Sequence, residues 1–164
     1  MSDLFQLKKI LTSYQKLAKW GDGEWIEEVD FMEWMYKGIK CLVFRNGFGS
    51  LCGFIYVPKD HPWHGKNYEQ IAVNVHGGLT YSREMNNQEH IIGFDCSHWN
   101  DLSPGLADPL IEARKSFNST QMEELDEKLR KLKKFLPLAT YKNISFVKSE
   151  CESLVDQMLS IKDI

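Results

Sequence analysis

The chain lacks the sequence features of several functional classes. Its apolar runs fall far short of the roughly 20 residues that span a membrane. Its first residues, MSDLFQLKKILTSYQKL, mix acidic and basic charge and contain no continuous apolar segment, which is untypical of a signal peptide. The net charge of -3 provides no basic face for nucleic acid. We therefore expect a cytoplasmic protein that neither enters a membrane nor binds nucleic acid directly.

Paired cysteines and the common catalytic motifs are also missing. The four cysteines (Cys41, Cys52, Cys96 and Cys151) are scattered and form no CxxC pair, which predicts buried free thiols in a reducing compartment. The sequence contains no HExxH, no phosphate-binding glycine loop and no nucleophile elbow. These absences disfavour an enzyme without excluding one.

The remaining patterns indicate a single α+β domain over residues 1–164. Two β-rich runs at 39–45 and 51–57 flank Asn46-Gly47, which predicts a β-hairpin, and a short strand is expected around 29–36. Apolar periodicity predicts helices at 3–19, at 119–136 and at about 143–160. The expected architecture is an antiparallel sheet with this central hairpin, packed by the N-terminal and C-terminal helices.

Potential metal ligands gather between residues 73 and 101. The apolar Val73–Val75 run leads to His76, and a second run, Ile91–Phe94, leads to Asp95. Three of the five histidines lie in this stretch, and His98 follows Asp95 by three residues. Each run is expected to be a strand that ends at a possible ligand, and neighbouring strands would bring these side chains together.

A zinc ion needs about four ligands from imidazole, thiolate and carboxylate groups. His76, Asp95 and His98 supply three, and we prefer Glu150 as the fourth because it lies beside the apolar face of the last helix, where an unpaired carboxylate is costly. The residues kept as alternative ligands or as neighbours of the site are His61, Cys96 and Asp101. The prediction is one zinc ion with a structural role. The same residues can also be explained without a metal, as hydrogen-bonded turn residues.

Several motifs resemble a group of small hypothetical proteins from phages and bacteria. The most specific are VHGGLTY at 75–81 and GFDC-x-H at 93–98, and the likeness covers roughly residues 39–106 and 141–155. The polar residues that recur in this group map onto His61, His76, Asp95, Cys96, His98, Asp101 and Glu150. The group is identified with phage-borne anti-CRISPR proteins that act on type II systems, one of them zinc-containing.

The resemblance implies a zinc-binding counter-defence protein that inhibits the host's RNA-guided nuclease by binding the nuclease protein. The acidic strips at 24–33 and 123–127 are candidate contacts to a basic nucleic-acid channel. The alternative is a metal-dependent hydrolase, or a nucleotide-binding counter-defence protein, that uses the same histidines and aspartates. Four protein ligands would favour the inhibitor with a structural metal, and three ligands plus water would favour the hydrolase.

Overall fold

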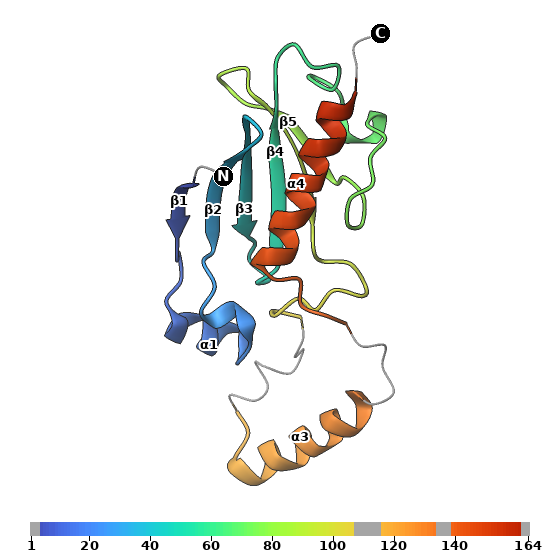
Figure 1. The fold of residues 1–164 in the computed structure, drawn as a ribbon. Helices are drawn as coiled ribbons and strands as arrows, with labels where there is room; N and C mark the ends of the chain where they lie inside the picture. Colours follow the sequence, from blue (N-terminus) through green and yellow to red (C-terminus); the bar gives the residue numbers. More distant parts are fainter. Residues whose placement is uncertain (1–3, 107–115, 134–138, 162–164) are drawn as a thin grey trace.

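The computed structural model describes residues 4–106, 116–133 and 139–161, and it centres on a six-stranded antiparallel sheet. The strand order is β1-β2-β3-β4-β6-β5, so the chain meanders through four strands before β5 is added outside β6 (Figure 1). The strands are β1 (Leu4–Lys8), β2 (Phe31–Tyr36), β3 (Ile39–Arg45), β4 (Leu51–Val57), β5 (Tyr81–Glu84) and β6 (His90–Asp95). The predicted α+β class and antiparallel sheet are confirmed.

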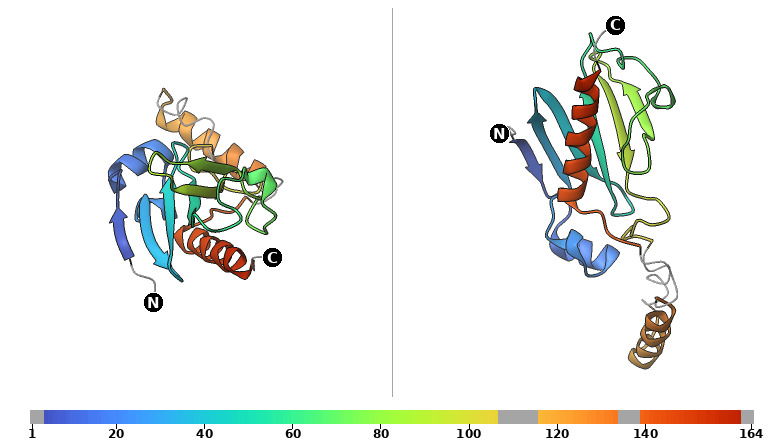
Figure 2. Two further views of the ribbon diagram at one scale, coloured as in Figure 1. Left: turned by 90° about the horizontal axis from the view of Figure 1, so that it is seen from above. Right: turned by 45° about the vertical axis from the view of Figure 1, so that its right-hand side comes forward.

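Helices lie on one face and at one end of this sheet. Helix α4 (Ile144–Ser160) crosses β3 and β4, whereas α1 (Ser13–Trp20) lies at one end and α3 (Ser119–Lys133) stands apart (Figures 1 and 2). Short 3-10 helices cover Glu24–Ile26 (η1) and Tyr68–Gln70 (η2). The face of α4 toward the sheet buries Val147, Cys151, Leu154, Val155 and Met158. Among the described helices, none combines the length and apolarity that a membrane crossing requires.

The predicted hairpin forms from β3 and β4. Arg45 pairs with Leu51 at its closed end, and the Asn46 side-chain oxygen accepts hydrogen bonds from the backbone N–H groups of Phe48 and Ser50 at 3.0 and 3.1 Å. Asparagine stabilises tight turns through such side-chain-to-backbone bonds. The turn connecting the two central strands is therefore encoded locally.

The predicted N-terminal helix at 3–19 is wrong over its first half. The Leu4–Lys8 segment forms the edge strand β1, in which Leu7 pairs with Met32 of β2. Helix α1 begins after Thr12, whose side chain accepts a hydrogen bond from the backbone N–H of Gln15. Pairing with β2 therefore overrides the helical spacing of the apolar residues, and residue 3 lies outside the described part of the chain.

Three further predicted elements are confirmed within the described residues. The strand expected around 29–36 is β2, and the helix expected at 119–136 is α3, with residues 134–136 outside the description. The last helix begins at Ile144, and the side chain of Asn143 caps it by accepting a hydrogen bond from the backbone N–H of Phe146 at 2.9 Å.

A buried ionic network joins α1 to the sheet. The Asp30 carboxylate lies 2.7 Å from the Lys16 ammonium and 2.8 Å from Nε of Arg45, and all three residues are buried. Its other oxygen accepts hydrogen bonds from the backbone N–H groups of Ile10 and Leu11. Burial raises the pKa of Asp30, but the hydrogen bonds from Lys16, Leu11 and Arg45 outweigh burial, so the pKa lies below its usual value.

Replacing Asp30 by asparagine is expected to destabilise the fold, because Lys16 and Arg45 would stay buried with one anion fewer. Breaking a buried ion pair costs about 3–5 kcal/mol, so Asp30→Asn should lower the melting temperature at pH 7 by about 10 °C or more. A lowered folded-state pKa stabilises above the unfolded pKa of about 4, and this stabilisation is lost as the pH falls through the folded value. The difference in melting temperature between the variant and the wild type should therefore be smaller at pH 3 than at pH 7, as thermal unfolding at the two pH values would show.

The matched control is Asp156→Asn, which removes a surface ion pair between Asp156 and Lys37, whose charged atoms lie 2.7 Å apart. Exposed pairs contribute little, so its melting temperature should stay close to that of the wild type. Equal effects of the two substitutions at pH 7 would show that the Asp30 network contributes no special stability.

Candidate metal centre

His76 is positioned by the glycine turn that follows it and by α4. The segment before it lies outside the strands of the sheet, so the strand expected at Val73–His76 is wrong. Val75 is nevertheless buried, and its carbonyl accepts the N–H of Gly78 at 2.9 Å to close the turn. The backbone N–H of His76 donates to Oε2 of Glu150 on α4 at 3.1 Å. This segment is therefore anchored by a turn and a helix.

His98 and Asp101 lie in a tight turn after β6. The N–H of Asp101 donates to the carbonyl of His98 at 2.9 Å, and the N–H of His98 donates to Oδ2 of Asp101 at 3.0 Å. Asp95, at the end of β6, accepts hydrogen bonds from the N–H of Ser97 and the hydroxyl of Thr80. The spacing H-x-x-D therefore brings His98 and Asp101 together through local hydrogen bonding.

His76, His98 and Asp101 converge on one point. One ligand atom of each lies within 4.8 Å of the others, and no other group of three or more potential ligands appears among the described residues. Oδ2 of Asp101 lies 2.9 Å from Nε2 of His76 and 3.0 Å from Nδ1 of His98. The Asp101 side chain is fully buried, while those of His76 and His98 are 15% and 26% exposed. The cluster therefore has a buried carboxylate and partly accessible imidazoles.

Hydrogen-bond donors and one ammonium group surround Asp101. The Lys142 ammonium lies 3.2 Å from Oδ1, on the oxygen opposite the one that faces both histidines. Burial raises the pKa of Asp101, but hydrogen bonds from His76, the His98 backbone, the His98 ring and Lys142 outweigh this effect and bring the pKa to about 2. Asp101 is therefore ionised at neutral pH and able to bind a cation. Neither the sequence motifs nor their spacing had indicated Lys142.

Two aromatic contacts and one glycine fix the imidazole rings. The His76 ring packs edge-on against the His98 ring at 5.3 Å between centroids and against Phe146 at 5.2 Å. Gly77 has a φ of +67°, and a Cβ atom there would overlap the His98 ring. Phe146 was not among the predicted site residues. The first glycine of the HGG motif therefore provides both a left-handed turn and the space for His98.

The donor set fits zinc. Zinc binds imidazole nitrogen and carboxylate oxygen at about 2.0–2.2 Å, so two ligand atoms of a tetrahedral site are about 3.3 Å apart. The separations of 2.9 and 3.0 Å around Oδ2 of Asp101 are somewhat shorter, because without an ion these atoms are joined by hydrogen bonds, and a small outward movement would reach that value. The predicted zinc site is therefore supported as a cluster that can hold a metal, and its members are His76, His98 and Asp101.

The other predicted ligands lie around this cluster. Asp95 is near His98, with 3.9 Å between Oδ1 and Nε2, and Glu150 hydrogen-bonds the backbone of His76. Cys96 is buried, and burial together with the Asp101 charge raises the pKa of its thiol well above the usual value, which keeps it protonated. His61 contacts the carbonyl of Met158 at the far end of α4 through Nε2. Asp101, expected as an alternative, thus joins the two histidines.

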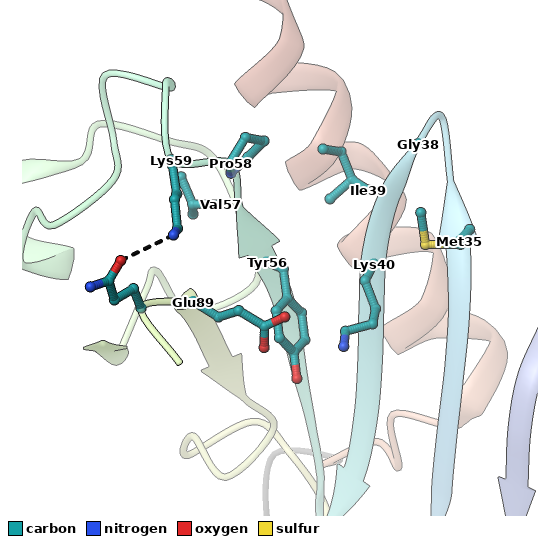
Figure 3. A pocket seen from close by; sticks show the side chains of 10 residues that line it. Met35, Gly38, Ile39, Lys40, Tyr56, Val57, Pro58, Lys59 and Glu89 are labelled. Atoms are coloured by element: carbon teal, nitrogen blue, oxygen red, sulfur yellow. Dashed lines mark hydrogen bonds between the residues drawn. The ribbon is translucent and has the colours of Figure 1, made fainter. Parts of the chain in front are cut away.

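A surface cavity lies at the other end of β4. Its volume is about 370 Å³, and it is lined by the ends of β2, β3 and β4 and by the tip of the β5–β6 hairpin. The Lys40 ammonium lies 4.1 Å from the centre of the Tyr56 ring, and Lys59 donates a hydrogen bond to the side chain of Gln88 (Figure 3). None of the three cluster residues lines this cavity.

Substitution of the two turn glycines separates backbone strain from loss of the site. Gly77 and Gly78 both have positive φ, +67° and +80°, but a Cβ atom on Gly78 would meet nothing within 4 Å. Both alanine variants should lose about 1 kcal/mol of stability from the left-handed backbone, whereas only Gly77→Ala should also displace His98 and weaken zinc binding at least tenfold. Calorimetric zinc titration and thermal unfolding test this. Equal zinc affinities in the two variants would contradict the packing of His98 on Gly77.

No family model, no curated protein and no solved structure matches this chain. The function is therefore inferred from the geometry of the cluster and from the resemblance of its motifs. That geometry is a metal-capable centre of two histidines and one aspartate, located where a glycine turn, the end of β6 and the start of α4 meet.

Proposed function

We propose that the protein binds one zinc ion through His76, His98 and Asp101. The observation that carries the proposal is the position of the buried, ionised Asp101 carboxylate, whose Oδ2 faces nitrogen atoms of both histidines at 2.9 and 3.0 Å. Imidazole and carboxylate together suit zinc better than magnesium or calcium, which prefer oxygen ligands alone. Lys142 can remain on Oδ1 while Oδ2 binds the ion.

Three protein ligands favour the hydrolase over a closed structural site. The nearby carboxylates already have partners, because Glu150 accepts the N–H of His76 and Asp95 accepts hydrogen bonds from Thr80 and Ser97. With three ligands, a fourth position is left for water, and zinc in such sites lowers the pKa of bound water to about 7. Asp95, which is partly exposed and whose Oδ1 lies 3.9 Å from Nε2 of His98, is the carboxylate that we assign as the base.

Inhibition of an RNA-guided nuclease is the second candidate. It is supported by the resemblance, whose two most specific motifs contribute His76 and His98 to the cluster. In the acidic strip at 24–33, Glu28 and Asp30 form ion pairs with Arg45 inside the protein and are not available to a partner. In the strip at 123–127, Glu123 and Glu124 on α3 are exposed. Helix α3 is therefore the better candidate contact to a basic channel. DNA cleavage with and without equimolar protein tests this candidate.

Measuring the zinc content tests the proposed zinc site directly. Protein purified without a histidine tag and dialysed to remove loosely bound ions should retain about one zinc per chain, and His98→Ala should lose it together with the extra thermal stability that the ion confers. Elemental analysis and thermal unfolding with and without a chelator provide the readings.

The control for the zinc measurement is His61→Ala, which removes a histidine that contacts Met158 and Trp63 outside the cluster. It should keep the zinc. A wild-type protein that retains no stoichiometric zinc, or an equal loss of zinc in the two variants, would overturn the proposed site.

Hydrolysis distinguishes the two functional classes. Zinc-loaded wild-type protein should hydrolyse an activated ester or a phosphodiester, such as a nitrophenyl substrate, and Asp95→Asn should reduce the rate by about 10²–10⁴-fold while retaining zinc, because a positioned base contributes that much. Rates and zinc contents of wild type and variant are compared at pH 7. If zinc-loaded wild-type protein hydrolyses the substrate no faster than buffer containing free zinc, the hydrolase is refuted and the inhibitor remains as the candidate function.

A further inference from the structure

A second pair of histidines lies outside the cluster. His64 belongs to the loop between β4 and η2, and His90 is the first residue of β6. Their ring centroids are 5.4 Å apart, and the rings are tilted by 51°. The two rings of the proposed zinc centre, His76 and His98, are separated by nearly the same distance, 5.3 Å. Two segments distant in sequence thus place a second pair of imidazoles side by side.

His90 holds an unpartnered nitrogen atom inside the protein. The residue is only 3% exposed, and its Nδ1 has no hydrogen-bond partner among the described residues. Its Nε2 lies 3.1 Å from the carbonyl oxygen of Lys66, which can only accept, so Nε2 carries the hydrogen. In the neutral ring, Nδ1 then has a lone pair that no donor meets, and leaving such a buried acceptor unsatisfied is unfavourable.

His64 is arranged in the same way. Its Nε2 lies 3.2 Å from the carbonyl oxygen of Gln88 and therefore donates to it, which leaves Nδ1 as the free acceptor of its neutral ring. Burial and the neighbouring His64 both lower the pKa of His90, which keeps that ring neutral. A metal ion binds an imidazole whose other nitrogen is held by a hydrogen bond, and in both rings a backbone carbonyl holds Nε2 and leaves Nδ1 for the ion.

The ring separation suits a shared ion. With zinc–nitrogen bonds of about 2.0–2.1 Å, two imidazoles on a tetrahedral ion have ring centroids about 5 Å apart. We propose that His64 and His90 form a second binding site for a divalent transition-metal ion of the zinc class, held through the two Nδ1 atoms and completed by water. It is independent of the His76, His98 and Asp101 centre.

The surroundings favour a cation and give it access. Glu84 pairs with His90 across β5 and β6, and its negative charge acts on the His90 ring. Gln88, whose backbone carbonyl accepts the hydrogen bond from His64, also lines the surface cavity of Figure 3, and His64 is half-buried, so the His64 side of the pair is the side open to solvent. A bound ion would tie the loop after β4 to the start of β6. With two protein ligands, this site should bind more weakly than the three-ligand centre.

The test uses the His98→Ala variant, in which the first centre is disabled. Calorimetric titration of metal-free His98→Ala protein with zinc should reveal about one site per chain, and adding His64→Ala should weaken that binding at least tenfold. His64 is only half-buried, so this substitution leaves the fold intact, as circular dichroism would verify. Adding His61→Ala instead is the matched control and should leave the titration unchanged.

Ring-nitrogen NMR separates a metal from a bound water. Zinc should shift the Nδ1 resonance of His90 while Nε2, held by Lys66, changes little. No zinc binding to His98→Ala, binding unaffected by His64→Ala, or an unshifted Nδ1 resonance would each overturn the second site. Because the titration uses a protein without the first centre, a negative result overturns only the second site and leaves the proposed function untouched. If instead the first centre does not bind zinc, the wild type should still show one site, at His64 and His90.

Discussion

One buried carboxylate, Asp30, connects the N-terminal region to the sheet and, through Arg45, to the start of α4. Asp30 neutralises Lys16 and Arg45, and Arg45 also donates to the hydroxyl of Tyr141. Glu28 accepts from that hydroxyl at 2.6 Å and from the first N–H of α4 at 2.7 Å. Separating any of these segments would leave a buried charge without its partner, which is unfavourable, so the network favours this mutual arrangement.

The proposed zinc centre depends on the position of the same helix. The start of α4 contributes Phe146 beside His76, the preceding residue Lys142 pairs with Asp101, and Glu150 one turn later holds the backbone of His76. A shift of α4 along the sheet would move all three contacts together. The ionic network at Asp30 thereby helps to position the cluster without touching it.

Strand β6 has a histidine pair at each end. His90 begins the strand and faces His64, while the turn after Asp95 places His98 against His76. In both pairs, one histidine comes from β6 or its continuation and the other from a long loop. Metal binding at either end would fix a loop to the sheet, which is how a small domain can order segments that bury little apolar surface.

Local patterns were sufficient for much of this protein. Turn chemistry at Asn46 and the apolar periodicity before Ser160 predicted the hairpin and the last helix, because short-range hydrogen bonds and one buried face specify both. The spacing of His76 and His98 likewise predicted two histidines of the cluster. The edge strand β1 and the contact of Lys142 with Asp101 depend on partners distant in sequence. They follow from strand pairing and from charge neutralisation in the folded chain, which no local pattern records.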